Sequence, residues 1–272
     1  MFDAHLHLSG LRHPQAVLEA LKSGALDSCL VSTVTESEAG ELLNRLQDYP
    51  AFLTIGAHPC FTRRRSFDRK ALDLLLQSPR GGRLVAIGEC GFDRHSPLDD
   101  REQEQLLLSC AEAAVSCNLP LVLHLTQRRG RALELLKDFP ALKVHVHWAS
   151  GSHEILRRYV KAGWTLGVCV SDSSAPERFK SLPVERLLPE SDFDAHKEAR
   201  LSYAGTLRAL TDLVSRAAAA LSLSPGSLYA RLEKTYRETF ALSEPVAVQE
   251  GSGSALPFTT HPEEDPCPTC IP

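Results

Sequence analysis

The sequence predicts an α/β protein of the (β/α)8 TIM-barrel class, and three observations support this fold. Eight short apolar runs recur along the chain, with helical patterns between them. Strand patterns that alternate with helical patterns are typical of parallel βαβ units, and eight such units close into a barrel. The length of 272 residues and the 43% hydrophobic content suit one barrel of this kind.

The predicted strands are short and mostly apolar, and the predicted helices lie between and after them. The strands are Phe2–Leu8, Ser28–Val34, Phe52–Ala57, Leu84–Glu89, Leu121–Leu125, Lys143–Trp148, Thr165–Val170 and Val184–Pro189. The helices are Pro14–Ser23, Glu36–Gln47, Phe67–Gln77, Arg101–Cys117, Gly130–Phe139, His153–Ala162, Leu201–Leu221 and Pro225–Phe240. An open doubly wound sheet is the alternative, but no Gly-x-Gly-x-x-Gly turn follows the first strand.

The composition changes after the last predicted helix. We therefore expect residues 1–242 to form the barrel. Residues 243–272 are rich in Pro, Gly, Ser, Thr and Glu without hydrophobic periodicity, and we expect a flexible tail outside the barrel. This tail contains Cys267-Pro268-Thr269-Cys270. A single Cys-x-x-Cys is a weak signal, so a structural zinc site and an unliganded tail both stay open.

Charge and cysteine usage limit the classes of protein that the chain can belong to. The formal net charge is −4, so no overall basic field indicates a protein that coats nucleic acid. An enzyme for phosphodiesters is still compatible, because bound metal ions would supply the positive charge. We expect a cytoplasmic protein without a membrane partner, since the chain has no long apolar run or secretory signal and its eight cysteines are scattered.

His5 and His7 lie two residues apart in the first predicted strand. Side chains of a strand alternate between its faces, so both imidazoles point to the same side. Neutral imidazole is a favoured ligand of divalent metal ions. The pair by itself leaves two interpretations open, a metal site and a pair of surface histidines.

Polar residues end several other predicted strands in the same way. Glu89, His124 and His147 end the fourth, fifth and sixth strands, and Glu190 and Asp192 follow the eighth. The carboxyl ends of barrel strands meet at one face, where the active sites of such barrels lie. A buried carboxylate is costly unless it is paired or bound to metal. The whole set predicts a metal centre, although any single histidine could be structural.

In order and spacing these residues resemble the TatD family of metal-dependent deoxyribonucleases, within the wider amidohydrolase-like barrels. The resemblance covers about residues 1–242. The matching pieces are Phe2–Leu8, Ile55–Pro59, Ala86–Asp93, Gln103, Leu119–Pro120, His124, His147–Gly151 and Leu187–Asp192. Each piece is short, but the combination is specific.

The resemblance implies two divalent metal ions, Mg²⁺ or Zn²⁺ with Mn²⁺ as a third option. The implied ligands are His5, His7 and Asp192 at one ion and His124 and His147 at the other, with Glu89 bridging the two. Two ions about 3.5–4 Å apart can stabilise the attacking and leaving oxygens of a phosphodiester. The resemblance further implies that Asp192 accepts a proton from the metal-activated water.

Four further residues are implied near the substrate. His58 and Glu190 would lie beside the metals, where they touch the scissile phosphate or orient ligands. Asp93 would support the same loop, with a turn or capping role as the alternative. The family usually has an arginine where this chain has Thr126. Arg128 follows as a candidate substrate contact, unless it simply begins a solvated helix.

The chain departs from the family pattern at two further places near the site. Trp148 replaces a small residue, so it could narrow the pocket, stack on a base or fill the core. Phe193–Arg200 replaces the usual Pro-rich loop, and it includes His196, a substrate contact or a surface side chain. Arg63-Arg64-Arg65 either guides a nucleic-acid backbone or forms a solvated loop.

These observations favour a divalent-metal nuclease with catalytic roles for Asp192, Glu89 and Glu190 and with DNA as its substrate. Two other hypotheses stay open. One is a related barrel hydrolase that acts on a small amide, lactone or phosphoester. The other is a catalytically weak subunit of a larger assembly, such as an anti-phage complex, although no surface for a protein partner is evident in the sequence.

Overall fold

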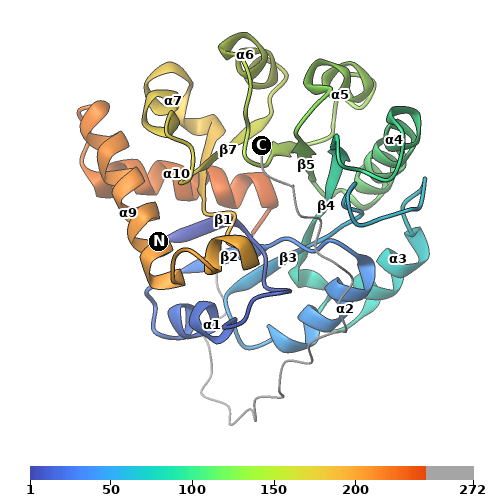
Figure 1. Cartoon of the computed structure of the whole chain (residues 1–272), viewed down its shortest axis with the longest axis horizontal. Helices are drawn as coiled ribbons and strands as arrows, with labels where there is room; N and C mark the ends of the chain where they lie inside the picture. The colour runs from blue at the N-terminus through green and yellow to red at the C-terminus, as the bar shows by residue number, and fades with distance from the viewer. Residues whose placement is uncertain (243–272) are drawn as a thin grey trace.

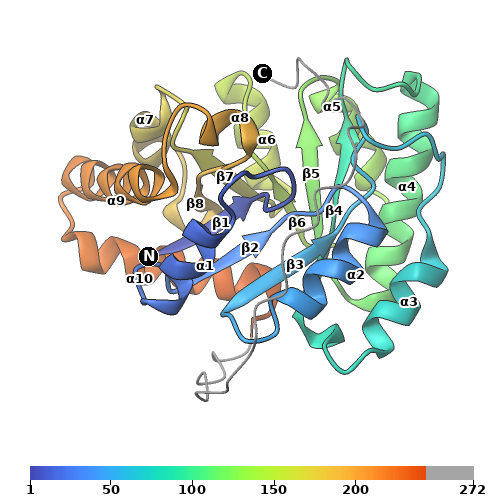
Figure 2. The same ribbon diagram turned by 60° about the horizontal axis from the view of Figure 1, so that its bottom comes forward.

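A computed structural model describes residues 1–242 of the chain. Figures 1 and 2 show strands in the centre of the molecule with helices around them. The strands are all parallel and follow one another in chain order within a single sheet. They are β1 (Phe2–Leu6), β2 (Ser28–Val31), β3 (Ala51–Ile55), β4 (Leu84–Phe92), β5 (Leu121–Leu125), β6 (Val144–Val146), β7 (Thr165–Cys169) and β8 (Leu187–Glu190).

The carboxyl ends of β1 and β8 close the sheet into a barrel. Asp192 N–H donates to the His5 carbonyl at 2.8 Å, and His7 N–H donates to the Phe193 carbonyl at 2.8 Å. Leu6 and Phe193 form a parallel bridge at the same place. The predicted barrel fold is therefore confirmed.

The helices cover the outside of the barrel. They are α1 (Gln15–Lys22), α2 (Glu36–Arg45), α3 (Arg69–Gln77), α4 (Asp100–Cys117), α5 (Arg129–Leu136), α6 (His153–Lys161), α7 (Ala175–Ser181), α8 (Ala195–Glu198), α9 (Tyr203–Ala220) and α10 (Pro225–Phe240). Several helices begin at a residue whose side chain caps the first turn. Asp99 caps α4 in this way and forms a capping box with Glu102. Such caps satisfy backbone N–H groups at the first turn.

The structure differs from the prediction at α7, α8, β8 and β4. α7 and α8 are short helices without a long apolar stripe, so periodicity did not indicate them. Val184–Arg186 forms a 3-10 turn, and the last strand begins only at Leu187. β4 continues to Phe92 because Gly91 and Phe92 pair with the end of β5.

The two ends of the barrel have different chemistry. At the amino-terminal end, α10 packs its Tyr236 ring on Phe2 of β1, with centroids 4.5 Å apart. At the carboxyl end lie the histidines and carboxylates described below. In barrels of this kind the amino-terminal face serves stability and the carboxyl face serves function.

Three sequence-based expectations concern the cysteines, membrane-spanning helices and the C-terminal tail. The six cysteines among residues 1–242 are all free thiols. No helix within that range is long and apolar enough to cross a membrane. The expected tail, with its Cys267-x-x-Cys270 pair, lies outside the described residues.

Candidate metal centre

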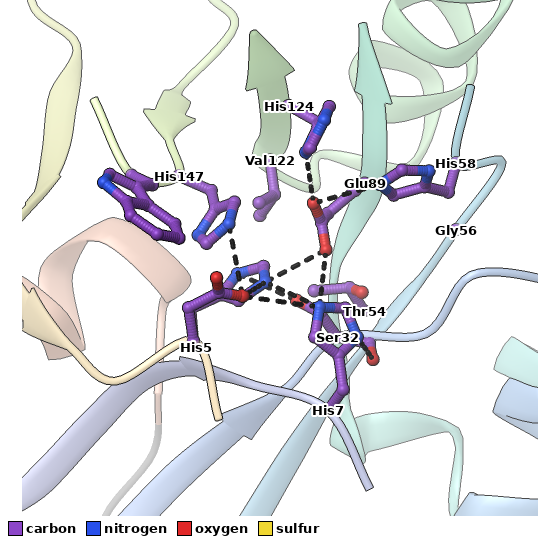
Figure 3. Close-up of polar contacts among 12 residues, drawn as sticks. His5, His7, Ser32, Thr54, Gly56, His58, Glu89, Val122, His124 and His147 are labelled. Carbon is purple, nitrogen blue, oxygen red and sulfur yellow. Dashed lines mark hydrogen bonds and ion pairs between the residues drawn. The ribbon is translucent and has the colours of Figure 1, made fainter. Parts of the chain in front are cut away.

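Glu89 lies at the centre of a cluster of histidines at the carboxyl end of the barrel (Figure 3). Its Oε1 atom is 3.0 Å from His5 Nε2 and 3.2 Å from His7 Nε2. Its Oε2 atom is 3.2 Å from His124 Nδ1 and 3.8 Å from His58 Nε2. The carboxylate is almost fully buried. From β4, Glu89 thus contacts the carboxyl end of β1, β5 and the loop after β3.

Asp192 completes the cluster from the opposite side. It follows β8 with a positive φ of 49°, a backbone conformation that is uncommon for a residue other than glycine. Its Oδ1 atom lies 3.8 Å from His5 Nε2, 3.7 Å from His7 Nε2 and 3.5 Å from His147 Nε2. His5 of β1 and His7, which follows β1, thus lie between the two carboxylates.

The cluster forms the floor of a cavity of about 320 Å³ that opens at this end of the barrel. Its polar lining includes His7, His58, Glu89, His124, His147 and Asp192. Apolar walls come from Val34, Phe61, Leu125 and Trp148. Phe61 was not singled out from the sequence, because a single aromatic residue in a loop carries no periodic signal.

Hydrogen bonds at the far side of the His7 and His124 rings, and an ion-pair contact at the far side of the His147 ring, define what these three histidines offer to this cavity. His7 Nδ1 lies 3.0 Å from the Ser32 carbonyl, His124 Nε2 lies 2.7 Å from Asp93, and His147 Nδ1 lies 3.0 Å from Glu190. Carbonyl and carboxylate oxygens only accept, so each of these nitrogens carries the proton. When such a ring is neutral, as a metal ligand must be, its other nitrogen presents a lone pair to the cluster.

His58 has the opposite arrangement. Its Nδ1 accepts a hydrogen bond from the Cys60 backbone N–H at 3.1 Å. Burial and the neighbouring His124 lower the pKa of His58 to about 3, so the ring is neutral. Its proton is therefore on Nε2, which lies toward Glu89 and the cavity. His58 offers a hydrogen-bond donor rather than a metal ligand.

The electrostatics of the cluster favour a positive charge beside Glu89. Burial raises the pKa of Glu89, but the surrounding imidazoles lower it well below its usual range. Burial lowers the pKa of His7, whereas Glu89 and Asp192 raise it to about 9. Burial and His147 lower the pKa of His5 to about 4. Ionised carboxylates thus face imidazole nitrogens, and either a proton or a metal ion can lie between them.

Three groups of side chains have ligand atoms within 4.8 Å of one another. His5, His7 and Asp192 form one group, as the resemblance implies. The implied second set is divided: Glu89 and His124 group with His58, whereas His147 groups with His5 and Glu89. The rings of His147 and His5 stack, with centroids 3.5 Å apart. The donor set, rich in imidazole and carboxylate, fits divalent transition metals or zinc.

Glu190 lies beneath the cluster and outside the cavity lining. Its side chain is fully buried and contacts His147 Nδ1 at 3.0 Å, the Trp148 backbone N–H at 2.5 Å and His145 Nε2 at 3.4 Å. Glu190 therefore lies behind His147 and not at the surface of the cavity. His145 was not singled out from the sequence, although it lies two residues before His147.

Asp93 also lies behind a histidine of the cluster, His124, rather than in the cavity. Its Oδ2 atom is 2.7 Å from His124 Nε2 and 3.1 Å from the Thr126 hydroxyl. Burial raises its pKa, but hydrogen bonds from His124 and from the His95 backbone lower it well below the usual range. Thr126, which replaces the family's usual arginine, thus helps to hold Asp93.

The arginines near the site differ in their distance from the cavity. Arg128 is exposed and pairs with Asp100, and it does not line the cavity. Arg129 lies nearer, since its Nη2 donates to the Ser150 hydroxyl at the cavity wall at 2.6 Å. Arg64 pairs with Glu36, and Arg65 pairs with a residue of α4. His196 does line the cavity.

Fold and site together define a class, a parallel (β/α)8 barrel that carries a histidine and carboxylate centre of metal-ligand type at its carboxyl face. The family model described as "TatD related DNase" matches residues 2–241. The chain belongs to this family.

Relatives and solved structures agree with this assignment. The chain is 27% identical over 207 residues to the "3'-5' ssDNA/RNA exonuclease TatD" of Erwinia tasmaniensis, covering 71% of this chain and 79% of that protein. It is 31% identical over 179 residues to the human "3'-5' RNA nuclease TATDN2", covering 61% of this chain but only 23% of that longer protein. The structure of YjjV, a TatD homolog from Escherichia coli K12, matches with a TM-score of 0.73 at 20% identity, covering 89% of this chain and 98% of that one.

Proposed function

We propose that the protein is a divalent-metal-dependent nuclease that cleaves single-stranded DNA or RNA from a chain end. The observation that carries this proposal is the orientation of His7, His124 and His147, whose outer nitrogens are engaged by acceptors so that the inner nitrogens face Glu89 and Asp192. The printed names of the relatives, an ssDNA/RNA exonuclease and an RNA nuclease, support the substrate class.

The proposed ligands are His5, His7, Asp192 and Glu89 for one ion, and Glu89, His124 and His147 for a second. Bound there, divalent ions would supply a Lewis acid for the phosphate and activation of a water molecule. Glu190 and Asp93 keep His147 and His124 in the orientation that binding requires. Asp192 is the proposed proton acceptor, because its Oδ1 atom faces the cluster at the cavity floor.

His58 and the apolar walls of the cavity are the proposed substrate contacts. Neutral His58 can donate its Nε2 proton to a phosphate oxygen beside the metal centre. Phe61 and Trp148 line the same cavity and offer faces on which bases could stack. A cavity of about 320 Å³ at the end of a barrel suits the end of a strand better than the middle of a duplex.

The test compares 3'-labelled and 5'-labelled single-stranded DNA and RNA with duplex DNA, each with Mg²⁺, Mn²⁺ or Zn²⁺ and with a chelator. We expect stepwise shortening of the single strands from one end, abolished by the chelator and by Glu89→Gln. A small aryl ester and a small phosphoester are assayed beside them. Turnover of a small substrate without cleavage of any nucleic acid would replace the nuclease proposal by the small-substrate hydrolase.

Two histidine variants separate metal binding from substrate contact. We expect His124→Ala to weaken divalent-ion affinity at least tenfold, because it removes an inward lone pair. His58→Ala should lower turnover about 10–100-fold with unchanged ion affinity, because His58 presents a donor. Equal loss of ion affinity in both variants would contradict the assignment of their protonated nitrogens.

A further inference from the structure

Two departures from the family pattern contact each other in the structure. Trp148 follows the ligand His147, and the segment Phe193–Arg200 follows Asp192. The short helix α8 within that segment carries Lys197 back toward the barrel. The Lys197 ammonium lies over the Trp148 ring, 4.3 Å from its centroid. The same ammonium contacts Asp192.

The Lys197 ammonium has an acceptor for each of its three protons. Its Nζ atom lies 2.8 Å from Asp192 Oδ2, 2.8 Å from the Asp192 carbonyl and 3.0 Å from the Ser191 carbonyl, with Cys169 Sγ farther away at 3.7 Å. The side chain does not line the cavity. An ammonium has three donors and no more, so Lys197 has no donor left for a phosphate of the substrate. Lys197 therefore affects the site through the side chains that it contacts at the cavity, which are Asp192 and Trp148.

The two oxygens of the Asp192 carboxylate have different partners, and Lys197 contacts only one of them. Oδ2 accepts from Lys197, and Oδ1 faces His5, His7 and His147. A carboxylate with both oxygens free can hold a metal ion with both, whereas Asp192 offers one. The backbone of Asp192, which has a positive φ, is held by the same ammonium through its carbonyl.

We propose that Lys197 is a positioning residue that restricts Asp192 to one oxygen at the metal centre and that moderates the affinity of this centre for divalent ions in favour of turnover. The proposal rests on the proposed metal-dependent function. Its electrostatic basis is simple: a fixed positive charge beside a ligand carboxylate repels the ion that this carboxylate binds. The Trp148 face holds the ammonium in place through a cation–π contact.

The test is Lys197→Met, which keeps most of the side-chain stem but removes the charge. We expect Mn²⁺ to bind about tenfold more tightly by calorimetry, because the repelling charge is gone. We expect kcat on a single-stranded oligonucleotide to fall about tenfold or more with KM within about threefold, because Asp192 loses its fixed orientation. A residue that only stabilised the fold would not produce tighter ion binding together with slower turnover.

Three further variants control this result. Lys197→Arg keeps the charge and should bind Mn²⁺ within about threefold of the wild type. Lys180→Met removes an exposed lysine of α7, which pairs with Glu177, and should change neither quantity. In an Asp192→Asn background, Lys197→Met should no longer tighten Mn²⁺ binding, since the carboxylate that couples the two is absent.

The outcomes distinguish this proposal from the proposed function. Unchanged or weaker Mn²⁺ binding by Lys197→Met, or an unchanged kcat on a substrate that the wild type cleaves, overturns the role of Lys197. If the wild type cleaves no nucleic acid, the nuclease proposal fails, and the Mn²⁺ titration alone still decides the role of Lys197. If Lys197→Met does not fold, as judged by circular dichroism, Lys197→Gln removes the same charge and carries the same expectation for Mn²⁺.

Discussion

Gly167 on β7 leaves the space that the Glu190 carboxylate occupies. A Cβ atom added at Gly167 would lie 2.1 Å from Glu190 Oε2 and 2.4 Å from its Cδ. Ordinary contacts of this kind are about 3.5 Å, so Gly167→Ala must displace the carboxylate by more than about 1 Å. Glu190 is buried and holds His147 and the Trp148 backbone, so both contacts are lost or stretched.

We expect Gly167→Ala to destabilise the protein by about 3–5 kcal/mol, the cost of breaking a buried ionic network on one side. For a domain of this size that corresponds to a fall in Tm of about 10 °C. Urea unfolding followed by circular dichroism gives the free energy, and a Mn²⁺ titration reports the loss of orientation at His147 as at least tenfold weaker binding.

Two comparisons isolate the steric cause. Gly82→Ala is the matched control, because its added Cβ meets nothing within 4 Å, and we expect a change within about 0.5 kcal/mol. In a Glu190→Ala background, where the carboxylate is absent, Gly167→Ala should cost less than about 1 kcal/mol further. A wild-type unfolding free energy for Gly167→Ala alone would refute the reasoning.

Four further expectations follow from the same geometry. Asp93→Ala should lower turnover about 10–100-fold, because His124 loses the acceptor that keeps its lone pair inward; unchanged kinetics would contradict this. Phe2→Ala, which removes the ring stacked on Tyr236, should cost about 3–5 kcal/mol in urea unfolding and leave the Mn²⁺ affinity of the folded protein within threefold. Arg128→Ala should leave KM for oligonucleotides within about twofold, and a larger rise would restore Arg128 as a substrate contact. Mn²⁺ at about 100 times its Kd should raise Tm by about 5–10 °C in a scan that a chelator reverses, whereas an unchanged Tm would contradict metal binding to the native state.

Much of the candidate site could be predicted because it depends on local periodicity. His5, Glu89 and His124 each lie at the end of an apolar run, and the end of a parallel strand has only one place in a barrel. His58 and Asp192 were implied by the family resemblance, because they lie in the matching pieces Ile55–Pro59 and Leu187–Asp192. The closed barrel was predicted from the number of strand and helix patterns alone, and the structure confirms this prediction.

The contacts behind the histidines of the cluster could not be predicted, because they depend on which atoms of distant segments lie close together in the fold. Periodicity gives no reason for Glu190 to lie behind His147 or for Arg128 to lie outside the cavity. Nor does it indicate that Lys197 returns to Asp192 and Trp148 from a segment without a family pattern.

His5 and His7 show where the boundary between sequence and tertiary structure lies. Their spacing by itself determined that both rings point to one side of the predicted strand Phe2–Leu8, since strand side chains alternate. Only the tertiary structure decided that Ser32 would accept from the outer nitrogen of His7, that Glu89 would lie 3.2 Å from its inner nitrogen, and that Asp192 would offer one oxygen. The physical reason is that alternation within a strand is local, whereas ring orientation and charge depend on atoms that only the closed barrel brings together.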